Sequence, residues 1–278
     1  MESLQVAHAQ DRNVCQARFF QCPKGLSLSN SSMIDYTSAN LSTHFSGATT
    51  SVYRFLIKTI VRTYDRPIVK AYVYLRFKII NPSILNAMLN YFEKDRRMLT
   101  LGCGFGLFDL AAGLRWPDKT IVGVDLDKGR IRQANTSADR LRLENVNFQV
   151  MDLSRDDVEL PETDEILLLD LLHHIPIEAQ ERIVRLAYDR LSEGGMMVVK
   201  DIHTAAPFKL FFTWLLDMIM TRWEPVYYRS QDAFESLFTD AGFKVITIFL
   251  DDILPYPHVL YVCTKPSPTH ASDSGEQP

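Results

Sequence analysis

The sequence predicts an α/β fold in which a doubly wound parallel sheet ends in an antiparallel hairpin. From Arg97 onward, short apolar runs alternate with helical patterns, as they do when crossover helices cover both faces of a parallel sheet. A glycine-rich loop follows the first of these runs and precedes a helical pattern. The last two apolar runs are separated by a gap too short for a helical crossover, which indicates that they pair antiparallel.

Five apolar segments are expected to form the parallel strands: Met98–Leu101, Thr120–Asp125, Val146–Met151, Glu165–Leu171 and Met196–Ile202. The periodicity predicts helices over Phe105–Arg115, Lys128–Leu143, Glu178–Leu191 and Ser230–Ala241. Gly242 follows the last of them and provides a left-handed helix end. The runs FKVITIFL and HVLYVCT then complete a seven-stranded, Rossmann-like sheet.

The segments outside the sheet predict four further regions. Residues 1–50 and 266–278 are polar and lack periodicity, so we interpret them as a flexible leader and a flexible tail. Residues 51–96 are expected to form a helical cap, which Pro67 and Pro82 divide into two or three helices. The sheet domain spans 97–265. Within it, Ala206–Trp223 is apolar on all sides of a helical wheel, so the insertion 204–228 predicts a hydrophobic lid, with ordinary packing against the sheet as the alternative.

Composition excludes several classes of protein. The chain has 278 residues and a net charge of −4, without the basic footprint that nucleic-acid binding requires. Its 4 cysteines form no C-x-x-C pair, and no ligand set for a metal is present, so we expect a cytoplasmic protein without metal. Residues 51–81 are locally basic, which leaves contact with a membrane surface as an alternative to a solvated face. Nothing indicates an oligomeric state.

The glycine-rich loop has the spacing G-x-G-x-G at Gly102, Gly104 and Gly106. Missing side chains let a backbone approach a ligand closely, and the next helix begins with unpaired N–H donors. Asp125 ends the second strand, where its carboxylate can accept from two ribose hydroxyls. The dinucleotide fingerprint has its third glycine one position later, where Leu107 stands. This spacing favours another nucleoside ligand and leaves an NAD(P)-dependent oxidoreductase as the alternative.

Five motifs together resemble those of class I S-adenosylmethionine-dependent methyltransferases: Met98–Gly106, Gly123–Asp127, Met151–Asp152, Asp170–Ile175 and Leu191–Gly195. The resemblance covers about Arg97 to Lys265. It implies S-adenosylmethionine as the cofactor and a binding site built from Thr100, Gly102, Cys103, Gly104, Gly106, Asp125, Leu126, Asp152, Leu153 and Asp170. Asp125 is expected to hold the ribose, Leu126 to pack on adenine and Asp152 to accept from the adenine amine. The chain departs from the family at Thr100, where an acid is frequent.

The candidate bases lie at the carboxyl ends of the fourth and fifth strands, where open α/β sheets bind ligands. They are His173, His174 and His203, because imidazole titrates near neutral pH. We expect the adjacent His173 and His174 side chains to diverge. Packing is the structural alternative for all three. The apolar lid and the aromatic cap favour a small hydrophobic acceptor, methylated on oxygen or carbon in specialised or lipid- or quinone-like metabolism. A binding subunit without catalysis is a further alternative.

Overall fold

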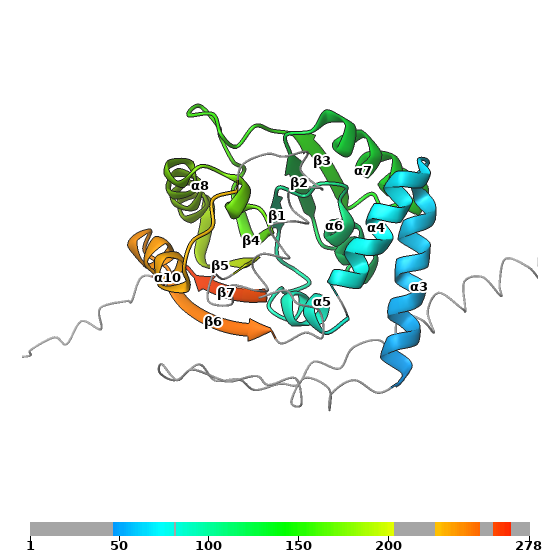
Figure 1. Cartoon of the computed structure of the whole chain (residues 1–278), viewed down its shortest axis with the longest axis horizontal. Coiled ribbons are helices and arrows are strands. Elements are labelled where there is room, and N and C mark those ends of the chain that lie inside the picture. The colour runs from blue at the N-terminus through cyan, green and yellow to red at the C-terminus, as the bar shows by residue number, and fades with distance from the viewer. Residues whose placement is uncertain (1–46, 81, 203–225, 251–257, 268–278) are drawn as a thin grey trace, which may run out of the picture. The chain divides into compact units, whose positions relative to one another are not determined.

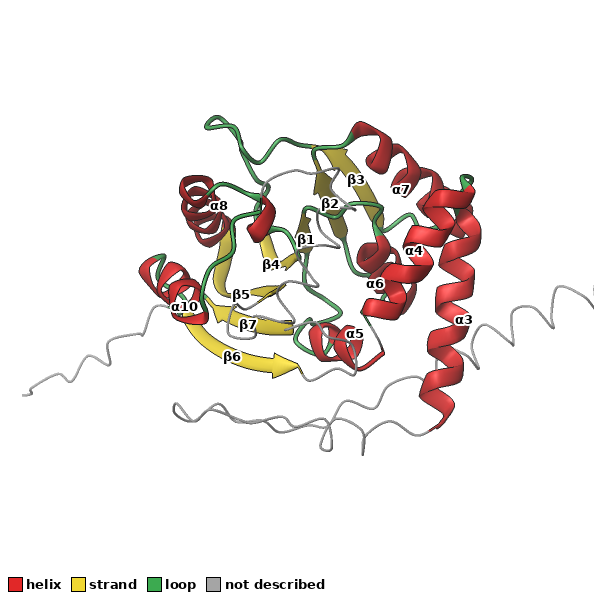
Figure 2. Ribbon diagram, viewed as in Figure 1, coloured by secondary structure: helices red, strands yellow, loops and turns green. Residues whose placement is uncertain are grey.

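The computed structural model describes residues 47–80, 82–202, 226–250 and 258–267. Its seven-stranded sheet has the order β3-β2-β1-β4-β5-β7-β6 (Figures 1 and 2). The five parallel strands are β1 (Met98–Leu101), β2 (Ile121–Asp125), β3 (Val146–Val150), β4 (Thr163–Leu169) and β5 (Leu191–Ile202). The strands β6 (Lys244–Leu250) and β7 (His258–Thr264) form the antiparallel hairpin. The predicted sheet and its terminal hairpin are therefore confirmed.

Helices cover both faces of the sheet. On one face lie α6 (Leu107–Arg115), α7 (Lys128–Leu141) and three helices that precede the sheet, α3 (Gly47–Thr63), α4 (Pro67–Ile79) and α5 (Pro82–Leu89). On the other lie α8 (Ile177–Arg190) and α10 (Gln231–Asp240). Consecutive residues of β4 alternate between these layers, because Leu167 packs on the first and Ile166 and Leu168 on the second. None of the described helices is long and apolar enough to span a bilayer.

Several predicted boundaries were wrong, each for a local reason. The first helix of the cap begins at Gly47, inside the segment interpreted as a leader. The helix after the glycine loop begins at Leu107 rather than Phe105, because Gly106 has a φ of 75° and starts it. The fourth strand ends at Leu169 rather than Leu171, because Asp170 has a φ of 49°. A 3-10 turn, η1 (Leu172–His174), follows.

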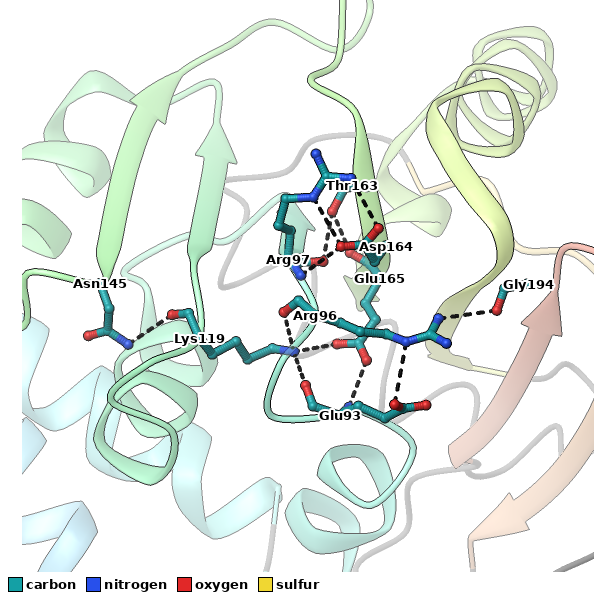
Figure 3. A network of polar contacts seen from close by, with 9 residues as sticks. All are labelled: Glu93, Arg96, Arg97, Lys119, Asn145, Thr163, Asp164, Glu165 and Gly194. Carbon is teal, nitrogen blue, oxygen red and sulfur yellow. Dashed lines mark hydrogen bonds and ion pairs between the residues drawn. The ribbon is translucent and has the colours of Figure 1, made fainter.

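A buried ion pair ties the cap to the sheet at the amino ends of the strands (Figure 3). The ammonium group of Lys119 lies 2.5 Å from the carboxylate of Glu165, and both side chains are almost fully buried. Lys119 also donates to the carbonyls of Glu93 and Arg96, while Glu165 accepts from the Glu93 N–H. Arg97 pairs with Asp164 at the surface nearby. These contacts hold the segment between α5 and β1 at the amino ends of the strands. The glycine loop lies at the opposite, carboxyl ends.

Candidate functional site

The glycine loop adopts a conformation that its three glycines make accessible. Gly102, Gly104 and Gly106 all have positive φ, between 58° and 75°, which other residues rarely adopt. Above Gly104 no atom lies within 4 Å of where a Cβ would stand, so this position leaves space beside the backbone. At Gly106 a Cβ would collide with the ring of Phe148 at 2.4 Å. Gly104 therefore keeps room for a ligand, whereas Gly106 allows close packing against β3.

Asp125 holds this loop from the end of β2. One carboxylate oxygen accepts the N–H of Gly104 at 2.9 Å, and the other accepts the N–H of Asp127 at 2.9 Å. The neighbouring Leu126 is 64% exposed. The Asp125 carboxylate, which can accept further hydrogen bonds, therefore lies next to an exposed apolar side chain. A ribose needs such an acceptor for its hydroxyls, and a nucleobase needs an apolar surface on which to pack.

A cavity of about 550 Å³ lies at the carboxyl ends of the strands. Nine of the ten residues predicted to bind the cofactor line it: Thr100, Gly102, Cys103, Gly104, Asp125, Leu126, Asp152, Leu153 and Asp170. Gly106 is the exception and lies behind the loop. The carboxylate of Asp152 already accepts from the N–H and hydroxyl of Ser154, which lowers its pKa. The sequence thus predicted which strand ends meet, while the contacts to a cofactor stay predictions.

The cap closes this cavity above the glycine loop. The hydroxyl of Tyr64, which follows α3, donates to the carbonyl of Phe105 at 2.6 Å. Tyr72 of α4 packs on the Phe105 ring, with 5.3 Å between the ring centroids. Tyr72 and Arg76 of α4 line the cavity, whereas Tyr74 of the same helix lies among the exposed side chains.

A buried acid beside the loop was missed by the sequence reading. Asp109, in the first turn of α6, lines the cavity region, and neither carboxylate oxygen has a hydrogen-bond partner among the described residues. Burial raises the pKa of Asp109 to about 6, although the neighbouring Thr100 hydroxyl favours the charged form. The chain therefore has an acid on α6 close to Thr100, whereas the family motif frequently has its acid in the strand, at the position of Thr100. The signal was an isolated Asp in the apolar run LFDLAAGL.

Asp109→Asn is expected to stabilise the cofactor-free protein at pH 8 by about 1–3 kcal/mol and to change it little at pH 4. An unfolded Asp ionises near pH 3.9, whereas Asp109 in the fold ionises near pH 6. The folded state therefore loses stability relative to the unfolded chain as the pH rises from about 4 through 6. Urea unfolding at both pH values measures this. Asp118→Asn, at an exposed position, is the control, and an equal effect of Asp109→Asn at both pH values contradicts the prediction.

Asp170, which was predicted to contact the cofactor, is held by two cations. Lys200 of β5 and Arg76 of α4 both pair with its carboxylate. Burial alone raises the pKa of Asp170, but the charges of Lys200 and Arg76 outweigh burial and hold that pKa well below its usual range. The carboxylate therefore joins the cap to β4 and β5 in addition to facing the cavity. Lys200 was not identified from the sequence, because it lies within an apolar strand.

Two of the three candidate bases lie together at the cavity. The Nδ1 atom of His173 is 2.6 Å from a carboxylate oxygen of Asp201, and both side chains are buried. The rings of His173 and His174 lie 4.1 Å apart, so the expected divergence was wrong: η1 keeps the neighbouring side chains together. Burial, followed by the charge of His173, lowers the pKa of His174 to about 3. His174 is therefore neutral near pH 7.

The residues after β5 complete one side of this cluster. Tyr227 donates its N–H to the carbonyl of His173 at 2.7 Å, and the ring of Tyr228 stacks on His173 at 5.6 Å. His203 and most of the predicted lid, residues 204–225, lie outside the described residues.

Comparison with known proteins identifies the class. A family model described as a methyltransferase domain matches residues 73–248, and the chain belongs to this family. The solved S-adenosylmethionine-dependent methyltransferase SibL is similar in fold, with a TM-score of 0.58, 19% identity and coverage of 81% of this chain and 72% of that one. The matched domain has the fold of class I S-adenosylmethionine-dependent methyltransferases, for which S-adenosylmethionine is the cofactor. The family match argues against the alternative of an NAD(P)-dependent oxidoreductase.

Other relatives share less with this chain. An O-methyltransferase family 2 protein from Planctomyces limnophilus, solved in complex with apigenin, has a TM-score of 0.54 and 16% identity, covering 70% of this chain and 61% of that one. The 23S rRNA (uracil(1939)-C(5))-methyltransferase of Xanthomonas euvesicatoria is 33% identical over 103 residues, which are 33% of this chain and 23% of that protein. The chain spans about a quarter of the length of the curated relatives it matches.

Proposed function

We propose that the enzyme methylates a small hydrophobic acceptor on oxygen or carbon, with His173 as the base. The observation that carries this proposal is the buried His173–Asp201 pair beside a cavity that Leu171 and Ile175 also line. A carboxylate on Nδ1 favours the tautomer with its proton there, which makes Nε2 the accepting atom. His174 is a poorer base, because a group with a pKa of about 3 binds a proton weakly.

The chain's own residues would divide the work as follows. When bound, S-adenosylmethionine supplies a methyl group on a positively charged sulfur. Asp125 would hold the ribose hydroxyls, and Leu126 would pack on adenine. Asp152 and Leu153 would also face the adenine ring. For an acceptor with a hydroxyl group, Nε2 of His173 would take the hydroxyl proton as the oxygen–methyl bond forms and the sulfur–methyl bond breaks. Asp201 would orient the imidazole and stabilise its positive charge.

The relatives support a small acceptor only in part. The fold neighbours include an O-methyltransferase bound to apigenin, although its identity to this chain is too low to indicate a shared substrate. The relative that acts on rRNA matches a third of this chain. Its substrate does not transfer to this protein, whose net charge is −4.

The acceptor can be found by incubating the enzyme with a metabolite extract and S-adenosylmethionine labelled in its methyl group. Mass spectrometry should detect a labelled small apolar product. Labelled RNA or protein, with no labelled small molecule, would contradict the proposal.

With that acceptor, Asp201→Asn is expected to lower kcat/KM by about 10²–10⁴-fold. The affinity for S-adenosylhomocysteine should remain within about twofold, since Asp201 lies outside the set expected to bind the cofactor. His174→Gln serves as the matched control and should cost much less than His173→Gln. If His173→Gln retains full activity, the transfer needs no base at this position and the proposed role of His173 is wrong.

A further inference from the structure

The outer side of the cap carries cations at a spacing of four residues. Arg54, Lys58 and Arg62 repeat every four residues along α3, and Arg66, Lys70 and Lys78 are separated by four and eight residues at α4. Residues four apart lie on one side of a helix, so each helix presents a basic stripe. None of these six cations pairs with a carboxylate in the described part of the chain. The nearby Asp65 is engaged by Arg140 at 2.7 Å.

Large apolar side chains lie exposed among these cations. Four of the eight exposed large hydrophobic residues in the described ranges belong to α3 and α4: Phe55 at 72%, Ile68 at 77%, Tyr74 at 50% and Leu75 at 46%. The opposite sides of both helices are buried, through Ile57 and Ile60 on α3 and Val73 and Phe77 on α4. Packing therefore fixes the orientation of the helices, and the mixed basic and apolar side faces outward. Figure 1 shows α3 and α4 side by side at the outer edge of the molecule.

Helix α4 joins this outer surface to the cavity. Ile68, Tyr72, Leu75 and Ile79 line the cavity, and they form one stripe of α4. Ile68 and Leu75 are also exposed, so they stand where the cavity meets the surface. Lys78 and Tyr74 lie on the adjoining side of the same helix, with the ammonium group 5.5 Å from the ring centroid.

We propose that the outer face of α3 and α4 docks on the surface of an anionic lipid bilayer. Helices with a cationic side and exposed aromatic and aliphatic side chains bind at this interface, with their apolar groups among the acyl chains and their cations near the headgroups. Docking here would place Ile68 and Leu75 against the bilayer, so that an acceptor could reach the cavity without crossing water. That purpose rests on the proposed hydrophobic acceptor, whereas the binding itself does not.

A nucleic acid is the other polyanion that such a surface could meet. Phe55 could stack on a base, but the aliphatic Ile68 and Leu75 gain nothing from a phosphate backbone. Exposed aliphatic side chains between cations therefore favour a lipid bilayer over a nucleic acid as the partner of this surface.

The test uses the full-length protein and sedimentation with vesicles of phosphatidylcholine, with and without phosphatidylglycerol. We expect binding only when the anionic lipid is present, and weaker binding at high salt. Each cation near an anionic surface strengthens binding about fivefold. Lys58→Ala/Arg62→Ala/Lys78→Ala should therefore weaken it by about 100-fold. Phe55→Ser/Tyr74→Ser should also weaken binding, without removing its salt dependence.

A matched variant carries three substitutions of exposed cations elsewhere, Lys128→Ala/Arg132→Ala/Arg185→Ala, and should bind vesicles like the wild type. Thermal unfolding and S-adenosylhomocysteine binding check that every variant is folded. Equal losses in both triple variants, or no binding to anionic vesicles, overturn the proposal. The proposal is also overturned if the Lys58→Ala/Arg62→Ala/Lys78→Ala variant loses binding to a structured RNA while its binding to vesicles is unchanged. Because no acceptor is needed, failure here is distinguishable from failure of the proposed function.

Discussion

Replacing Lys119 with methionine is expected to destabilise the protein by about 3–5 kcal/mol. The substitution leaves the Glu165 carboxylate buried without its counter-charge. Burial already raises the pKa of Glu165, while the hydrogen bond from the Glu93 N–H and the ammonium group of Lys119 favour its charged form. Two carbonyls, those of Glu93 and Arg96, lose their donor at the same time. Because these atoms connect the cap to β1 (Figure 3), the cap and the sheet should both lose stability.

Urea unfolding followed by circular dichroism measures this effect, and Arg97→Met provides the control. The Arg97–Asp164 pair joins the same segments but is solvent-exposed, so its loss should cost about 0–1 kcal/mol. The double variant Lys119→Met/Glu165→Met removes both buried charges and should recover part of the loss. Similar losses for Arg97→Met and Lys119→Met would show that burial does not set the strength of the Lys119–Glu165 pair.

The sequence predicted the sheet well because its strands depend on local patterns. Each of Met98–Leu101 and Ile121–Asp125 is short, apolar and bounded by turn residues, and this length with these flanks indicates a buried strand. The glycine loop was equally accessible, since only glycines satisfy three positive φ angles so close together. Asp125 followed from its position at a strand end.

Residues whose roles depend on contacts across the fold could not be predicted. Lys200 lies in an apolar strand, and its partner Asp170 is 30 positions away. The burial of Asp109 is visible only when helix α6 is packed on the sheet, where it contacts β2 and β3. His173 and His174 are neighbours with similar sequence environments, but Asp201 pairs with only the first of them. Pairing over such distances is set by the topology of the sheet, and no local pattern records it.

Asp125→Ala is expected to weaken binding of S-adenosylhomocysteine by about 10²–10⁴-fold. A hydrogen bond to a charged group contributes about 1.5–3 kcal/mol, and the carboxylate is expected to accept two from the ribose. The same change removes the acceptor of the Gly104 N–H, which loosens the loop. Isothermal titration calorimetry gives the affinity. Asp127→Ala is the matched control: its carboxylate caps α7, so stability should fall by about 0.5–2 kcal/mol while cofactor affinity is kept.

A cofactor analogue separates the two roles of Asp125. S-adenosylhomocysteine lacking the ribose hydroxyls has nothing to donate to the carboxylate, so any loss that Asp125→Ala causes with this analogue reports the loosened loop. The difference between the losses with the two ligands is the coupling between the carboxylate and the hydroxyls. We expect most of the loss to depend on the hydroxyls, because the loop retains its glycine conformations and the contact of Tyr64 with Phe105. Equal losses with both ligands would mean that Asp125 acts on the loop alone and that another group recognises the ribose.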